Sequence, residues 1–267
     1  MKDAEELVSF YDQGYTQAPT DASRYARWRA LGAVGKADHV LALCAQARST
    51  AGGPSDGRTA GERGSGAPSS TLEVGCGGGA LLSELHRRDF GGRLSGVEIT
   101  GAAVEIARTR EEIASVERYD GLHLPAADGE YDLGIVSHVL EHVPDPPALL
   151  AEVARACRAV VVEVPLEANL SARRARKREH ADEVGHLQRL SRGDARAIVF
   201  DAGLRIAGEL EDPLPLAVHR FLAPDTPMAR AGASAKWALR AGLHRLAPPL
   251  ARRLYTVHYA CLCLPCA

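Results

Sequence analysis

Apolar and polar positions follow two different periods along residues 71–165. Short apolar runs, TLEVG, RLSGVEI, YDLGIVS and AVVVEVP, have the length and composition of buried strands. Between them, ALLSELHRR, GAAVEIARTREEIA and ALLAEVARAC place apolar residues at helical spacing. Strands that alternate with helices predict an α/β fold, in which helices cover both faces of a parallel sheet. Ligands bind such sheets at the carboxyl edge of the strands, where the strand order reverses.

The flanking segments have other patterns. Residues 1–44 are expected to form an N-terminal helical cap, because Val40, Leu41 and Cys44 mark an apolar stripe. Residues 45–70 are rich in Gly, Ser, Pro and Arg and contain no large apolar residue, which predicts a flexible loop. Residues 71–267 are expected to form the main domain. Within it we expect a helix and a strand in SRGDARAIVFDAGLRIAGEL, a helical insertion over about 212–253 and a last strand in LYTVHYACLCL.

Composition narrows the class of protein. The chain has 267 residues, of which 46% are hydrophobic and 25% charged, with a formal net charge of −2. These values are ordinary for a globular domain and exclude a wholly disordered or collagen-like chain. The first residues, MKDAEEL, lack the basic start and apolar run of a signal peptide, so we expect a cytoplasmic protein. Six cysteines without an export signal predict free thiols.

A glycine-rich turn, Leu72-Glu73-Val74-Gly75-Cys76-Gly77-Gly78-Gly79, separates the first strand from the first helix of the core. Glycine permits the positive φ angles that let a backbone approach a ligand closely, and the helix start offers free N–H groups. Glu98 follows 23 residues after Gly75, at the end of the next strand, where a carboxylate can accept two ribose hydroxyls. This pattern also satisfies the dinucleotide fingerprint, so NAD and another adenosine cofactor both remain open.

Four segments in order resemble class I S-adenosylmethionine (SAM)-dependent methyltransferases, of the small-molecule, type 11-like group. They are LEVGCGGGALLSEL, GVEI, YDGLHLPAADGEYDL and SHVLEHVPDP, and the resemblance is close over residues 71–165 and loose over 185–211. Glu73, two residues before the first glycine, is typical of methyltransferases rather than NAD-binding folds. The resemblance implies a Rossmann-like, doubly wound sheet of seven strands, mostly parallel with the last strand antiparallel.

The resemblance implies a role for each matching residue in binding SAM. Gly75, Gly77 and Gly79, with Cys76 in the same turn, would face the methionine part, and Glu73 would orient its amino group. Glu98 would take the ribose hydroxyls and Ile99 would pack on the adenine. Asp120 and Gly121 would bond the adenine edge. Ser137 and His138 would lie near the methyl group, and Tyr11 and Tyr15 would close over the cofactor from the N-terminal helix. The full set is Tyr11, Tyr15, Glu73, Gly75, Cys76, Gly77, Gly79, Glu98, Ile99, Asp120, Gly121, Ser137 and His138.

The acceptor chemistry is less specific. A hydroxyl acceptor needs a general base, and histidine is the default because its pKa lies near neutral pH. His138, His142 and His186 are the candidates. His142 can equally cap or pack the turn after the strand, and His186 can equally hold its own loop in place. The look-alikes favour O-methylation, while N- or C-methylation stays open. We assign no metal site: CLCLPC lacks a second ligand pair, and His180–His186 has no known catalytic spacing.

Two basic regions indicate an acceptor class. Residues 173–178 contain five cations, and no acidic residue follows Asp225. Lys236, Arg240 and His244 share one helix face, which suits an anionic, glycan or lipid-linked small molecule, with peripheral membrane contact as a further interpretation. The insertion is then expected to act as a substrate cap. Few aromatic residues and the net charge of −2 disfavour nucleic acid and an RNA methyltransferase. An NAD-dependent oxidoreductase and a non-catalytic SAM-binding partner protein also stay open.

Overall fold

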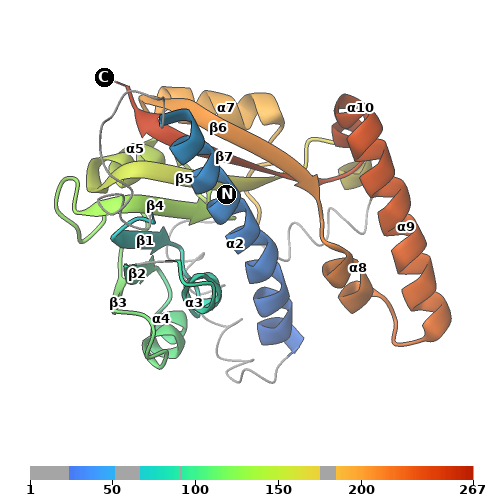
Figure 1. Ribbon diagram of the computed structural model, residues 1–267, viewed down its shortest axis with the longest axis horizontal. Coiled ribbons are helices and arrows are strands. Elements are labelled where there is room, and N and C mark those ends of the chain that lie inside the picture. The colour runs from blue at the N-terminus through green and yellow to red at the C-terminus, as the bar shows by residue number, and fades with distance from the viewer. Residues whose placement is uncertain (1–23, 52–66, 91, 175–184, 267) are drawn as a thin grey trace.

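The computed structural model describes residues 24–51, 67–90, 92–174 and 185–266. Their centre is one sheet of seven strands in the order β3-β2-β1-β4-β5-β7-β6 (Figure 1). Its strands are β1 (Ser70–Val74), β2 (Arg93–Glu98), β3 (Ser115–Arg118), β4 (Tyr131–Ser137), β5 (Cys157–Leu166), β6 (Leu204–Pro213) and β7 (Val257–Pro265).

The first five strands are parallel, and β7 is antiparallel to both of its neighbours, β5 and β6. The chain builds outward from β1 to β2 and β3, then returns to place β4 on the other side of β1. This reversal creates a switch point between the carboxyl ends of β1 and β4, where α/β sheets bind ligands. The predicted seven-stranded, mostly parallel α/β fold is confirmed.

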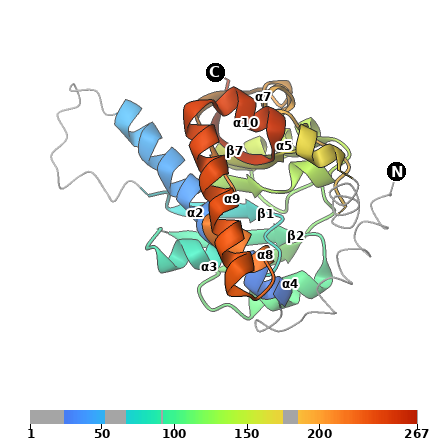
Figure 2. The ribbon, with the colours of Figure 1, turned by 90° about the vertical axis from the view of Figure 1, so that its right-hand side faces the viewer.

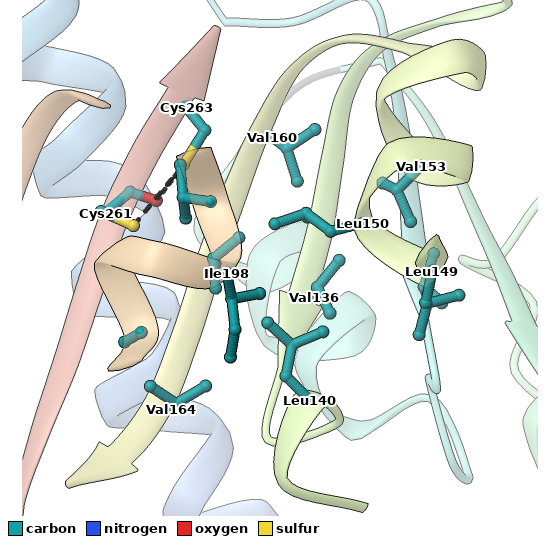
Figure 3. Close-up of a cluster of buried hydrophobic side chains, with 14 of the residues drawn as sticks. Val136, Leu140, Leu149, Leu150, Val153, Val160, Val164, Ile198, Cys261 and Cys263 are labelled. Atoms are coloured by element: carbon teal, nitrogen blue, oxygen red, sulfur yellow. Dashed lines mark hydrogen bonds between the residues drawn. The ribbon is translucent and has the colours of Figure 1, made fainter. Parts of the chain in front are cut away.

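Two apolar layers cover the sheet. On one face lie α2 (Arg24–Ala51), α3 (Ala80–Arg87) and α4 (Gly101–Arg108), which bury a layer that includes Leu43, Leu82 and Val104. The other face carries α5 (Pro146–Ala156) and α7 (Arg192–Asp201), whose Leu150, Val153 and Ile198 pack on β4 and β5 (Figure 3). Because both faces are covered, the central strands are continuous apolar runs.

The connection between β6 and β7 consists of α8 (Leu216–Leu222), α9 (Pro227–Leu246) and α10 (Pro248–Leu254). These helices stand beyond the end of the β6–β7 pair, and α9 runs across the front of the molecule in Figure 2. No residue of α9 is buried, and Met228 and Leu246 are each 85% exposed. No helix in the described part of the chain has the length and hydropathy needed to cross a membrane.

Two local expectations were wrong. Residues 45–51 continue α2 rather than starting the loop, because Ala, Gln and Arg are strong helix formers. The helix expected over 101–114 ends at Arg108, and residues 109–114 form turns. Strand β3, which follows them and pairs with β2, was not predicted.

The expectations for the cysteines are confirmed. The cysteine-rich end belongs to the last strand, β7, where Cys261 and Cys263 are buried, and all six cysteines are free.

Candidate active site

The glycine turn between β1 and α3 forms the floor of the switch point. Gly75, Gly77 and Gly79 have φ angles of 71°, 54° and 76°, which side chains other than glycine rarely adopt. A Cβ on Gly75 would lie 2.6 Å from Cγ2 of Val139, and one on Gly79 would lie 2.5 Å from Cδ1 of Ile113. Gly75 N and Cys76 N donate to Val97 O at 2.9 and 3.1 Å, which ties the turn to β2. The turn can therefore approach a ligand with bare backbone.

Glu73 places a buried carboxylate on β1, just before the glycine turn. The residue is 4% exposed, and its Oε2 has no hydrogen-bond partner in the described part of the chain. Burial raises the pKa of Glu73 to about 8, with Glu98 adding to the shift and Lys36 opposing it. An unsatisfied carboxylate in an apolar setting is costly, so this position favours a cationic ligand group such as an ammonium.

Glu98 ends β2 and turns its carboxylate across the glycine turn. Its Oε2 accepts from Gly77 N at 2.9 Å, and its Oε1 accepts from Ile99 N at 2.8 Å and Thr100 N at 3.1 Å. Burial raises the pKa of Glu98, while these backbone N–H groups oppose the rise. The contacts hold the carboxylate at the edge where a ribose would sit, with lone pairs available to hydroxyl donors.

Two further predicted contacts lie next to Glu98. Gly121 has a φ angle of 94°, and a Cβ built on it would be 3.7 Å from Cγ2 of Ile99. Asp120 is exposed and accepts from Leu122 N at 2.8 Å and His123 N at 2.7 Å. Hydrogen bonding to His123 lowers the pKa of Asp120 to about 2. These residues and the glycine turn, together with Glu73 and Glu98, are called the cofactor cradle below.

Ser137 ends β4 and His138 follows it, at the β4 side of the switch point. His138 has a φ angle of 57°, a left-handed conformation that is uncommon outside glycine. Its Nδ1 lies 3.4 Å from Glu141 Oε1, and its Nε2 lies 3.3 Å from Glu163 Oε1. Burial and Lys36 act to lower the pKa of His138, but the two carboxylates outweigh them and raise it. The imidazole is therefore a stronger base than a free histidine.

Sequence reasoning missed a group of buried side chains behind His138. Glu163, on β5, is 1% exposed and accepts from Ser137 Oγ at 3.3 Å. Its Oε2 lies 3.3 Å from His39 Nδ1 on α2, and its Oε1 lies 3.5 Å from His258 Nδ1 on β7. His39, His138, Glu163 and His258 are called the imidazole–carboxylate cluster. The available signal was Glu163 itself, a carboxylate inside the apolar run AVVVEVP.

Helix α2 brings charge into both parts of the site. Lys36 Nζ lies 3.5 Å from Ser137 O, and its charge acts on Glu73 and His138. His39, three residues later, also reaches Asp212 Oδ1 at 3.2 Å. Burial acts to lower the pKa of His39, but Asp212 and Glu163 raise it to about 10. His39 is thus a charged link between α2 and the sheet.

The two remaining candidate bases, His142 and His186, lie together beside Glu141. Their ring centroids are 4.7 Å apart, although 44 residues separate them in sequence. His142 Nδ1 lies 3.1 Å from Gly185 O, and His186 Nδ1 lies 2.7 Å from Glu167 Oε2. Burial lowers the pKa of His142. Tyr11, Tyr15 and His180 lie outside the described residues.

Comparisons with known proteins identify a methyltransferase domain. Residues 72–160 match the family model of a methyltransferase domain. Ubiquinone biosynthesis O-methyltransferase of Acinetobacter baylyi is 32% identical over 96 residues, which are 34% of this chain and 38% of the relative. The same enzyme of Thiobacillus denitrificans is 34% identical over 93 residues. The chain thus spans about 38% of the length of these curated relatives.

Solved structures share the fold at low identity. Geranyl diphosphate C-methyltransferase from Streptomyces coelicolor, in complex with S-adenosyl-L-homocysteine, is 18% identical with a TM-score of 0.53. The match covers 75% of this chain and 71% of that one. Phosphoethanolamine N-methyltransferase 2 from Haemonchus contortus, in complex with S-adenosyl-L-methionine, is 13% identical with a TM-score of 0.52, over 75% and 49% of the two chains.

Proposed function

We propose that this chain, whose residues 72–160 form a class I SAM-dependent methyltransferase domain, transfers a methyl group to the oxygen of an anionic small molecule. The observation that carries the proposal is the position of His138. It lies at the switch point opposite the cofactor cradle, between two buried carboxylates that support a proton on its ring. The ubiquinone O-methyltransferases among the relatives support an oxygen acceptor.

The cofactor cradle fits SAM, the cofactor of this family. The unsatisfied Oε2 of Glu73 suits the ammonium of the methionine part, and Glu98 suits the ribose hydroxyls. A Cβ on Gly75 or Gly79 would collide with Val139 or Ile113, so only glycine lets the turn keep the positive φ angles that expose its backbone. When bound, SAM supplies an electrophilic methyl group on a positively charged sulfur. The chain must then hold the acceptor in line with that group, and positioning alone can lower the barrier by about 7–11 kcal/mol.

His138 is the proposed general base. In its neutral form one ring nitrogen accepts the hydroxyl proton as the oxygen–methyl bond forms and the sulfur–methyl bond breaks. Both ring nitrogens face a carboxylate, Nδ1 that of Glu141 and Nε2 that of Glu163, so the acceptor hydroxyl must replace one of these contacts, and the remaining carboxylate stabilises the imidazolium. His142 and His186 are the alternative bases, and their Nδ1 atoms are engaged by Gly185 O and Glu167.

Three cations support an anionic acceptor. Arg174 follows β5 at the carboxyl edge, and its charge acts on Lys236 and Arg240 of α9. Burial, together with this repulsion, lowers the pKa of both α9 residues. In the described part of the chain, neither Lys236 nor Arg240 forms an ion pair with a carboxylate. Like charges held close together without a counter-ion favour the binding of an anion.

A cavity of about 490 Å³ lies between α2, α8 and α9 and also presents arginines, Arg220 and Arg230, beside Phe221. It supports the proposal that α8–α10 form a substrate cap. The exposed apolar residues of α9, together with its cations, support peripheral membrane contact as a way to reach a lipid-linked acceptor.

Calorimetric titration with S-adenosylhomocysteine and NAD in parallel tests the cofactor half. Micromolar binding of the first alone is expected, and binding of NAD alone would overturn the proposal.

For the acceptor half, anionic and neutral phenols of equal size are compared as substrates. Lys236→Ser with Arg240→Ser is expected to raise KM for the anionic acceptor about tenfold with little change for the neutral one, because each lost charged contact is worth about 1 kcal/mol near the surface. Equal effects on both acceptors would remove these cations from the site.

A further inference from the structure

Two imidazoles and one carboxylate from distant segments converge beside the cofactor cradle. Glu141 and His142 belong to the short helix η1 (Leu140–His142), and His186 precedes α7. One ligand atom from each of the three residues lies within 4.8 Å of the other two. His142 Nε2 is 3.9 Å from Glu141 Oε1. Burial of the Glu141 carboxylate costs free energy, so this cluster requires an interaction that offsets the cost.

The stabilisation of the buried Glu141 carboxylate is the main evidence for a ligand at this cluster. It is 1% exposed, and neither carboxylate oxygen has a hydrogen-bond partner in the described part of the chain. His138 Nδ1, at 3.4 Å from Oε1, is the closest imidazole nitrogen, and Oε2 has no such neighbour. A buried carboxylate is expensive unless it is hydrogen-bonded, paired or bound to a metal. A cation bound next to Glu141 would balance the charge of its carboxylate.

The two imidazoles are oriented as metal ligands are. His142 Nδ1 faces the carbonyl of Gly185, which can only accept, so Nδ1 carries the proton and Nε2 carries the lone pair. His186 Nδ1 faces the carboxylate of Glu167 at 2.7 Å, so its Nε2 carries the lone pair. Metal-binding histidines characteristically donate their other N–H to a carbonyl or carboxylate in this way.

The backbone fixes the two segments against each other. Leu187 N and Gln188 N both donate to Glu141 O, at 2.9 and 3.2 Å. Gln188 Nε2 donates to Val143 O at 2.9 Å. The two residues after His186 therefore bond to Glu141 and Val143, on either side of His142, and hold the two histidine-bearing segments against each other.

The imidazole–carboxylate cluster nearby offers a useful contrast. His138, Glu163 and His258 also bring ligand atoms together. There, however, the carboxylate accepts from Ser137 and pairs with His39. Glu163 thus has both a hydroxyl donor and close imidazole partners, whereas the partners of Glu141 in the described part of the chain are imidazole nitrogens at 3.4 Å (His138) and 3.9 Å (His142).

We propose that Glu141, His142 and His186 bind a divalent transition ion of the zinc type. Two histidines and one glutamate form a donor set of catalytic zinc sites, and imidazole selects such ions over Mg²⁺. In a tetrahedral site, ligand atoms about 2.0–2.2 Å from the ion lie about 3.3–3.6 Å apart, so ligand atoms that now lie within 4.8 Å of one another would move closer by about 1 Å when the ion binds. This assignment departs from the prediction of no metal, because sequence spacing did not bring His186 to His142. It does not depend on the proposed methyl transfer.

The test is metal binding by the full chain after removal of ions with a chelator. Co²⁺ is titrated with visible absorption as the readout, and Zn²⁺ is then added as competitor. We expect one equivalent of Co²⁺ with intense bands typical of low coordination, displacement by Zn²⁺ and no displacement by a large excess of Mg²⁺. Absence of these bands at millimolar Co²⁺ would overturn the proposal.

Variants locate the ion. His142→Ala and His186→Ala are each expected to weaken Co²⁺ binding at least 100-fold, and Glu167→Gln about 10- to 100-fold, the range found for residues that orient metal ligands. His86→Ala, on the exposed side of α3, is the matched control and should bind as the native chain does. Circular dichroism and S-adenosylhomocysteine affinity check that each variant is folded. Unchanged Co²⁺ affinity in folded His186→Ala would overturn the proposal, as would loss of binding in His258→Ala alone.

Discussion

The cofactor cradle and the imidazole–carboxylate cluster meet at one sheet edge but are built differently. The cradle comes from consecutive strand ends, and much of it is backbone, held by contacts such as Gly77 N to Glu98. The cluster takes one side chain each from α2, β4, β5 and β7, and every member is titratable. Under the proposed function, cofactor recognition would therefore be local in sequence, whereas acceptor chemistry would depend on long-range packing. Separate substitutions should separate the two functions.

The sharpest separation is expected from His138→Ala. Loss of a general base should lower kcat by about 10²- to 10⁴-fold, while the Kd for S-adenosylhomocysteine changes less than twofold. Because the carboxylates raise the pKa of His138, the native rate should climb with pH above about 6.5, the ordinary histidine value, and the variant should lose this limb. Steady-state kinetics and calorimetry measure the two quantities. Parallel losses in both would show that the two regions are not separable.

Glu98→Ala should have the opposite profile. Two charge-assisted hydrogen bonds to a ribose are worth about 1.5–3 kcal/mol each, so cofactor affinity should fall about 100-fold or more. The fold should remain, because the backbone bonds from Gly75 and Cys76 to Val97 still hold the turn. Glu105→Ala, on exposed α4, is the control. Unchanged affinity, measured by calorimetry, would remove Glu98 from the cradle.

His39→Gln tests the cluster through stability rather than rate. The pKa of His39 is about 10 in the folded chain and near 6.5 when unfolded, so the native state holds an extra proton between these values. Its stabilising effect is complete below pH 6.5 and is lost as pH rises toward 10. Urea unfolding should give a deficit of about 2 kcal/mol for the variant at pH 6, as for charged hydrogen bonds. That deficit should shrink by pH 9.5, and a deficit independent of pH would contradict the ion pairs.

The smallest expected effect is the pH dependence of cofactor binding, which follows from the protonation of Glu73. With a pKa of about 8, its carboxyl is mostly protonated at pH 7, and an arriving ammonium should ionise it. Cofactor binding should therefore release close to one proton at pH 7, and affinity should tighten about tenfold from pH 6 to 7. Calorimetry in buffers of different ionisation enthalpy measures the release. Glu73→Gln should abolish it, and release that persists in this variant would assign the proton to another group.

The sequence predicted the cradle better than the cluster for a physical reason. Gly75, Glu98 and Asp120 lie at strand ends whose order along the chain is also their order in space on that side of the sheet. His39 and His258 lie 219 residues apart and meet only because α2 covers the sheet and β7 inserts between β5 and β6. Periodicity identifies an apolar helix face, but it does not say which polar residue of that face meets a buried carboxylate. The pairing of β3 with β2 was hidden for the same reason.

Helix α2 and strand β7 contribute residues to the cluster but lie outside the segment that matches the methyltransferase family. The segment that matches the methyltransferase family ends at residue 160 and begins at residue 72. Lys36, His39, Glu163 and His258 all lie outside it. A chimaera that exchanged only residues 72–160 with a relative would import a complete cofactor cradle, yet the host would still supply most of the imidazole–carboxylate cluster. If the proposed function holds, such a chimaera would keep the acceptor preference of the host while taking the cofactor cradle of the relative.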